Sequence, residues 1–131
     1  MERLYNASCD PKLLSPLTLA FIGDGVFDLF VRERLVCAAN APVAALHKNA
    51  VAQVRCEAQA AAVQKILPLL TQEETAVFMR GRNAHSRTPK NASPADYHAA
   101  TAFEAVFGYI YLKGDIERLR ELFSIMCDEQ R

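Results

Sequence analysis

Two acidic residues lie within apolar stretches and are the side chains best suited to do chemistry. Asp24 lies in LAFIGDGVFDLF (residues 19–30), and Glu104 lies in TAFEAVFGYIYL (residues 101–112). Burying an unpaired carboxylate costs several kcal/mol even after relaxation, so protonation, an arginine or a metal ion must offset that cost. One shared cation explains two such acids in a small domain more simply than two separate arginines do. We therefore predict that folding brings Asp24 and Glu104 together around a divalent ion.

The types of ligand available indicate which ion this would be. Carboxylates without a nearby His or Cys favour a hard, oxygen-preferring cation, which means Mg²⁺, with Mn²⁺ as a substitute. The chain has no Glu-x-x-His motif, which argues against a di-iron carboxylate bundle. It also lacks His-Glu-x-x-His and adjacent His-Asp pairs, which argues against zinc peptidases and histidine-based metal phosphohydrolases.

A simpler interpretation of Asp24 is an ion pair within the fold. Arg32, Arg34 or another basic residue could neutralise it, and structural ion pairs of this kind are common. Gly23 and Gly25 would also allow a local distortion of a helix that exposes the acid. Under this alternative, each acid has its own cationic neighbour and the two acids need not meet.

The segment between Glu74 and Asp96 contains no acidic residue and is rich in cations. Gly81, Pro89 and several Asn and Ser residues predict that its middle is a loop. Arginine side chains on a loop suit phosphates because guanidinium groups bind phosphate oxygens in a bidentate manner. The alternative is a solvated connection whose cations balance acids elsewhere. The candidate phosphate-binding residues are Arg80, Arg82, Asn83, His85, Arg87 and Lys90.

The signals for helices are strong along the chain, whereas those for strands are weak. Capping and periodicity predict helices from Pro16 to about Ala39, from Pro42 to about Leu67 with at most one interruption, from Thr71 to about Met79, from Pro94 to Lys113, and from Asp115 to about Glu129. The Asp-Gly pair at 24–25 falls inside a helical pattern and not between two alternating runs, so it does not indicate a hairpin. The sequence predicts an all-α domain.

Length and composition limit the remaining possibilities. A chain of 131 residues is about one domain, here residues 1–131. With 15 basic and 15 acidic residues, its net charge of zero means that any attraction to nucleic acid must come from local clustering. The four cysteines are far apart and form no Cys-x-x-Cys pair, which argues against a zinc knuckle. The N-terminus has no apolar core for a signal peptide, and no segment spans a bilayer without a charge, so we expect a cytoplasmic protein.

Three segments taken together resemble a known family. LAFIGDGVFDLFVRERL (residues 19–35) and TAFEAVFGYIYLKGD (residues 101–115) resemble the paired signatures of the ribonuclease III catalytic domain. GRNAHSRTPKNAS (residues 81–93) is similar to the smaller Mini-ribonuclease III branch. The larger enzymes carry two further acids, one before each signature acid, where this chain has Ala20 and Thr101. Mini-ribonuclease III proteins are similar to this chain in lacking both.

The resemblance implies an all-helical homodimer with a single ribonuclease III-type domain of about five to seven helices. It implies a Mg²⁺-dependent endoribonuclease that cuts both strands of double-stranded RNA and leaves 5′-phosphate and 3′-hydroxyl ends. Asp24 and Glu104 take the catalytic and metal-binding roles by this resemblance, and the substrate would be the precursor of large-subunit ribosomal RNA. The chain ends just after its last predicted helix, so we expect no separate double-stranded RNA-binding domain.

Two other functions remain open at this point. One is a non-catalytic RNA-binding or ribosome assembly factor that kept the fold, an alternative that Ala20 and Thr101 sustain. The other is a helical dimerisation module in which the acids form ion pairs. The apolar residues of the first helix, with Phe21 and Phe27, are either a dimer interface or part of the core.

Overall fold

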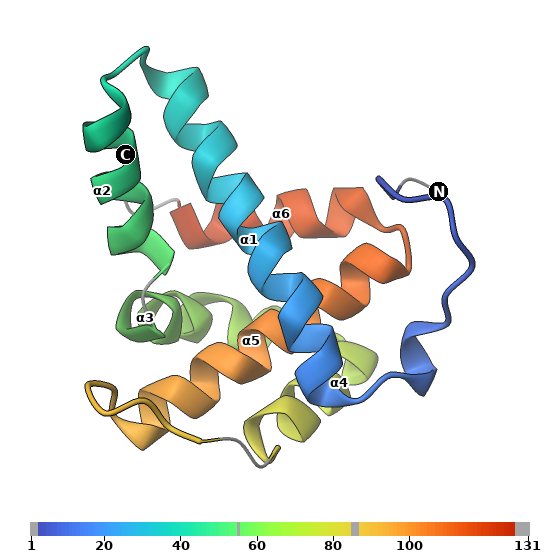
Figure 1. The fold of residues 1–131 in the computed structure, drawn as a ribbon. Coiled ribbons are helices and arrows are strands. Elements are labelled where there is room, and N and C mark those ends of the chain that lie inside the picture. Colours follow the sequence, from blue (N-terminus) through green and yellow to red (C-terminus); the bar gives the residue numbers. More distant parts are fainter. Residues whose placement is uncertain (1–2, 55, 85–86, 128–131) are drawn as a thin grey trace.

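The computed structural model describes residues 3–54, 56–84 and 87–127, and these residues contain helices and no strands. The all-α prediction is therefore confirmed for them (Figure 1). The α-helices are α1 (Pro16–Ala38), α2 (Val43–Val54), α3 (Cys56–Ile66), α4 (Gln72–Arg82), α5 (Pro94–Leu112) and α6 (Ile116–Cys127), and two short 3₁₀ helices are η1 (Pro11–Leu13) and η2 (Leu67–Leu69). In the described part of the chain, no helix is both long and apolar enough to cross a membrane.

Side-chain caps fix where the main helices begin. The Ser15 hydroxyl accepts a hydrogen bond from the Thr18 amide at 3.2 Å, and the Ser93 hydroxyl accepts one from the Asp96 amide at 3.1 Å. A proline follows each serine at the first helical position, where its missing N–H costs nothing. Thr71 begins α4 with a capping box. These starting points were predicted, and the structure confirms them.

The ends of two predicted helical regions are refined by the structure. The second helical region divides once, because α2 ends at Val54 and α3 begins at Cys56. The prediction that α4 ends near Met79 is wrong, because α4 continues to Arg82. Gly81 does not break the helix; a Cβ added there would lie 2.8 Å from the Ala102 Cα on α5, so glycine lets the two helices pack closely. The predicted end of the last helix, at Glu129, lies outside the described residues.

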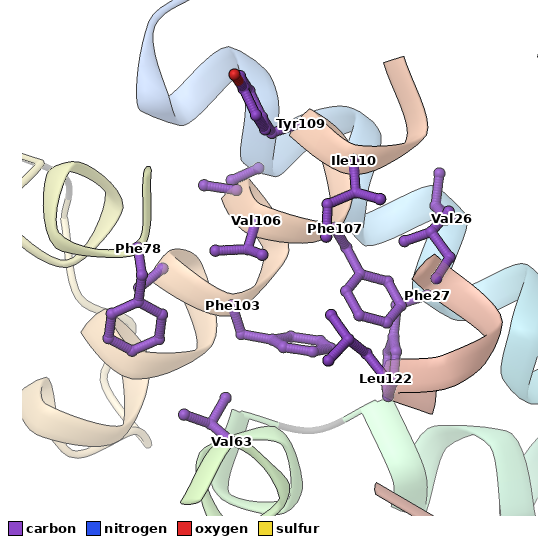
Figure 2. Close-up of a cluster of buried hydrophobic side chains, with 14 of the residues drawn as sticks. Val26, Phe27, Val63, Phe78, Phe103, Val106, Phe107, Tyr109, Ile110 and Leu122 are labelled. Atoms are coloured by element: carbon purple, nitrogen blue, oxygen red, sulfur yellow. The ribbon is translucent and has the colours of Figure 1, made fainter. Parts of the chain in front are cut away.

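The helix α5 forms the centre of the molecule. It packs against α1, α3, α4 and α6. Figure 1 shows that it runs through the middle of the fold. Phe103 and Phe107 of α5 form edge-on contacts with Phe27 of α1, with ring centroids 5.0 and 5.8 Å apart (Figure 2). Such aromatic pairs add about 0.5–1.5 kcal/mol to the free energy of unfolding beyond their burial. Phe27 therefore belongs to the core, and the core interpretation is the correct one for this residue.

The helices α1 and α5 cross so closely that their backbones touch. A Cβ added to Gly23 would lie 1.7 Å from the carbonyl oxygen of Glu104, and one added to Gly108 would lie 2.0 Å from the carbonyl oxygen of Leu19. Neither position can hold a side chain while the helices keep this separation. The crossing therefore depends on glycine at both positions, and it sets the residue after Gly23 next to Glu104.

The opposite face of α1 is open to solvent. Phe21 is 83% exposed, Leu29 is 51% exposed and Val36 is 60% exposed. The core interpretation is therefore wrong for Phe21 in a single chain. An apolar groove of about 480 Å³ runs beside this face, with Ile22, Leu29 and Phe30 among its lining residues.

Candidate active site

Asp24 and Glu104 lie side by side where α1 crosses α5. The pKa of the Glu104 carboxyl is raised from 4.5 to about 8, first by burial, then by the negative charge of Asp24 and by a hydrogen bond between the two carboxyl groups. Two carboxyl groups can share a hydrogen bond only when one of them carries a proton. The structure thus brings the two predicted acids together, and the acid with the raised pKa is the one from the central helix.

The two acids differ in their exposure. Glu104 is partly buried beneath the crossing, whereas Asp24 is exposed. The expectation of a buried carboxylate is therefore wrong for Asp24. Gly23 occupies the position on α1 that faces α5, and Asp24 consequently projects from the side of the helix. A site with one sheltered acid and one accessible acid can hold a cation and still admit a polymer.

The ion-pair alternative receives no support from the described residues. Arg32 pairs with Asp28 at 2.8 Å, and Arg34 donates a hydrogen bond to Gln53 at 3.0 Å. Within the part of the chain that the structure describes, neither Asp24 nor Glu104 forms an ion pair.

Gln59 is a residue at this site that we did not predict. It lies on α3, is only 1% exposed, and donates a hydrogen bond from Nε2 to Oε2 of Glu104 at 3.3 Å. A signal for it was present in the sequence, because Gln59, Val63 and Ile66 have the spacing of one helical face. A glutamine that shares a face with two aliphatic residues is expected to be buried and to need a polar partner.

The set of donors fits a hard metal ion. Among the described residues, no group of three or more His, Cys, Asp or Glu side chains is placed to hold a metal, so the site offers two carboxyl groups and one amide. All three side chains carry oxygen, the ligand atom that Mg²⁺ and Mn²⁺ prefer. Ala20 and Thr101 precede the acids by about one turn and are both 7% exposed, so they contribute packing and no charge.

The basic residues gather at the end of α4 and on the connection from α4 to α5. Arg80 and Arg82 belong to the last turn of α4 and not to a loop, which corrects the prediction for these two. Asn83 ends α4, and Arg87 and Lys90 are exposed on the connection that follows. His85 lies outside the described residues. Five of the six candidates are therefore located, and all five side chains are exposed: Arg80, Arg82, Asn83, Arg87 and Lys90.

This basic segment is hydrogen-bonded to α5, which carries Glu104, and to the residues that lead into α1, which carries Asp24. The Arg80 guanidinium donates a hydrogen bond to the carbonyl oxygen of Leu14, just before α1, at 3.3 Å. Nδ1 of His98 on α5 lies 3.2 Å from the carbonyl oxygen of Arg82. His98 precedes Glu104 by six residues, which is about 9 Å along the axis of α5. The basic segment is thus fixed to the same helix as Glu104, within the length of a few nucleotides.

The raised pKa of Glu104 predicts how stability depends on pH in the absence of metal. Between about pH 5 and pH 8 the folded chain binds a proton that the unfolded chain has released, because the pKa of Glu104 rises from 4.5 to about 8 on folding. The free energy of unfolding is therefore expected to fall as pH rises through this window and to level off above it. In Glu104→Gln this part of the decline is expected to disappear.

Urea unfolding in EDTA at five pH values from 5 to 9 (roughly one unit apart) gives the free energy of unfolding of wild type and Glu104→Gln. The difference between the two proteins at each pH tests the prediction. The expected difference is on the order of a few kcal/mol by pH 8. Glu117→Gln is the control, because the Glu117 side chain is 83% exposed and should leave the profile unchanged. Parallel profiles for wild type and Glu104→Gln would contradict the contact between the two acids.

Comparison with known proteins shows which family this chain resembles. A family profile described as "Ribonuclease III domain" matches residues 17–115, a range that includes both acids. A "Mini-ribonuclease 3" of Symbiobacterium thermophilum is 46% identical over 120 residues, covering 91% of this chain and 92% of that protein. Another, from Thermoanaerobacter sp., is 47% identical over 113 residues, covering 86% and 80%. A crystal structure of a Fusobacterium nucleatum protein matches with a TM-score of 0.85 and 27% identity, covering 95% of this chain and 100% of that one.

Proposed function

Because this chain belongs to the Mini-ribonuclease III branch of the ribonuclease III family and is an endoribonuclease, we propose a specific reaction for it. The protein hydrolyses phosphodiester bonds in both strands of double-stranded RNA, and it uses Mg²⁺, for which Mn²⁺ can substitute. The observation that carries this proposal is the contact between Asp24 and Glu104 at the crossing of α1 and α5.

The two acids would share one divalent ion but differ in protonation and in access to RNA. Glu104 and Asp24 would hold the divalent ion, which would supply the Lewis acidity that lowers the pKa of water and offsets negative charge at the phosphate. Binding the ion requires Glu104 to release the proton that its raised pKa retains. Asp24, being exposed, lies where an RNA strand can reach it. Water adds to phosphorus, the bond from phosphorus to the 3′-oxygen breaks, and that oxygen gains a proton, which leaves 5′-phosphate and 3′-hydroxyl ends.

A cutting assay tests this function directly. Purified protein and a long RNA duplex are incubated with MgCl₂, and the ends of the products are analysed. We expect cleavage that requires the metal, stops in EDTA, and yields products that a 5′-phosphate-dependent exonuclease can degrade. A non-catalytic RNA-binding or assembly factor would bind the duplex and leave it intact, and that result would overturn the proposed reaction.

The basic segment is proposed to hold the RNA backbone. Its residues are Arg80, Arg82, Asn83, His85, Arg87 and Lys90, and duplex RNA is recognised chiefly through its shape, phosphates and 2′-hydroxyls. A protein with zero net charge needs such a local concentration of cations to bind a polyanion. We propose that the physiological substrate is the large-subunit ribosomal RNA precursor in the cytoplasm, and that the reaction is part of ribosome biogenesis.

Removing two cations from this segment tests its role. In an Arg82→Ala, Arg87→Ala double variant, the slope of log affinity against log salt is expected to become shallower by about one for each phosphate group that the variant no longer binds. Cleavage at saturating RNA should remain within about twofold of wild type, because neither arginine holds the metal. Filter binding across a salt series measures the slope, and Lys48→Ala on the exposed surface of α2 is the control. An unchanged slope would instead favour a helical dimerisation module.

We propose that a second copy of this chain covers the open face of α1. A helix exposing Phe21, Leu29 and Val36 beside an apolar groove has the character of an interface, since monomers rarely leave such patches uncovered. A two-fold dimer would present two pairs of acids, one for each RNA strand. Phe21 is three residues before Asp24 on α1, so an interface at this face would lie next to the site.

Analytical ultracentrifugation of a Phe21→Asp variant measures this association. We expect wild type to sediment as two chains and Phe21→Asp to shift toward one, with at least about a tenfold weaker dimer, because a carboxylate would replace an aromatic ring at the interface. Circular dichroism should be unchanged, since Phe21 is 83% exposed in the single chain. Val43→Asp, at an 80% exposed position on α2, should leave the mass unchanged. A wild type that remains a single chain would contradict the dimer.

A further inference from the structure

Gln59 is buried, yet only half of its amide group is satisfied. Its Nε2 donates a hydrogen bond to Oε2 of Glu104 at 3.3 Å. Its Oε1 is buried and has no hydrogen-bond partner among the residues that the structure describes. A buried acceptor left without a partner costs about 1–3 kcal/mol of stability. Folding alone would be better served by leucine here, so the amide requires another explanation.

The surroundings of Gln59 make this choice of residue more informative. Val63 and Ile66, on the same face of α3, are 0% and 2% exposed, and this face packs against α5. The polar partner of Gln59 in the described structure is Glu104, one of the two acids of the proposed metal site. A single polar side chain in an apolar helix face is thus directed at the buried acid of the site.

We propose that Gln59 is a positioning residue that fixes the orientation of the Glu104 carboxylate toward Asp24. Its own amide oxygen accepts a hydrogen bond from water held in the metal site. This inference rests on the function proposed above. An amide suits the position because it adds an oxygen acceptor without adding a third negative charge beside two carboxyl groups. It also fits a chain in which Ala20 and Thr101 supply no further carboxylate near the acids.

The geometry distinguishes Gln59 from other polar residues on α3. Gln64 lies on the same helix but is exposed, so it provides a matched control for the loss of an amide. Gln59→Leu keeps a similar volume and removes both polar atoms. Since it also removes the buried oxygen that lacks a partner, the variant should fold at least as stably as wild type. Stability and metal binding can therefore be separated in one variant.

The experiment compares wild type, Gln59→Leu and Gln64→Leu. Thermal midpoints are measured without RNA over a series of MgCl₂ and MnCl₂ concentrations, and kcat and KM are measured on an RNA duplex. In Gln59→Leu we expect an unchanged or higher midpoint in EDTA. We also expect that the metal concentration giving half of the maximal rise in thermal midpoint is at least about tenfold higher than for wild type. Residues that orient metal ligands typically change metal affinity by 10–100-fold. The value of kcat should fall by about tenfold or more and KM should stay within about threefold. Gln64→Leu should match wild type throughout.

Three results would overturn the proposal, and they differ in what else they affect. A Gln59→Leu protein with wild-type metal response and kcat would show that Gln59 does not position Glu104. Loss of midpoint and kcat together, with an unchanged metal response, would assign Gln59 a structural role only. Wild type that neither cuts RNA nor responds to either metal would overturn the proposed function itself, and the role of Gln59 with it.

Discussion

Asp24→Asn is expected to lower the single-turnover rate of cleavage of an RNA duplex by at least about 10³-fold, which corresponds to about 4 kcal/mol in the activation barrier. The substitution replaces one of two carboxylates with a neutral amide, so the affinity for a divalent ion falls sharply. Folding should be little affected, because Asp24 is exposed and forms no ion pair within the described residues. Affinity for RNA should stay within about threefold or improve, since a negative charge is removed near a phosphate.

Glu104→Gln is expected to lower the cleavage rate by the same factor, because it removes the other carboxylate of the metal site. The double variant should be about as slow as either single variant, because residues that act as one unit give strongly non-additive losses. Asp28→Asn is the matched control: Asp28 lies one turn beyond Asp24 on α1 and pairs with Arg32 at 2.8 Å on the surface. Its loss should cost less than about 1 kcal/mol of stability and leave the rate within about twofold.

Rapid-quench cleavage with protein in excess over RNA gives the rate, and gel shift in CaCl₂ or EDTA gives the affinity. Folding is followed by circular dichroism in the same samples. An Asp24→Asn or Glu104→Gln protein that keeps more than a tenth of the wild-type rate would remove these residues from the catalytic role. Equal losses in Asp28→Asn would point to a general effect of charge on this face of α1.

Residue type and surroundings were enough to predict which two acids meet. Asp24 and Glu104 each interrupt an apolar stretch, and the described structure joins them at one helix crossing. Their exposure was not predictable from the same pattern. A helical wheel places residues around an axis but does not say which side the neighbouring helix occupies. Because the backbone of α5 lies against Gly23, Asp24 is turned outward and Glu104 alone is sheltered.

Glycine also accounts for the error at the end of α4. On sequence grounds Gly81 indicates a loop, since glycine is a poor helix former. In the structure it lies within the helix, and the position needs glycine because a side chain there would collide with Ala102 on α5. A long-range contact thus overrides a local preference, and the information needed lies about twenty residues away along the chain. For Gln59, the pattern of its own helix could have predicted burial, but not its partner Glu104, which is on another helix.

Gly23→Ala is expected to destabilise the fold by at least about 3 kcal/mol, a large share of the 5–15 kcal/mol typical of a domain. The added Cβ would lie 1.7 Å from the carbonyl oxygen of Glu104 and 2.7 Å from its carbonyl carbon. Backbone atoms inside a helix cannot turn aside as a flexible side chain can, so α1 and α5 must move apart. That movement also separates Asp24 from Glu104, and any folded fraction should cut RNA at least about tenfold more slowly.

Gly25→Ala provides the opposite expectation two residues along the same helix. In the single chain, no atom beyond its chain neighbours and the nearby backbone of α1 lies within 4 Å of a Cβ added there, so alanine should raise the free energy of unfolding by about 0.5–1 kcal/mol through its better helix propensity. Urea unfolding of wild type and both variants at one protein concentration measures the contrast. Equal stability of Gly23→Ala and Gly25→Ala would mean that α1 and α5 are not in backbone contact. The placement of Asp24 beside Glu104 depends on that contact, so the two glycines test the geometry of the site without altering either acid.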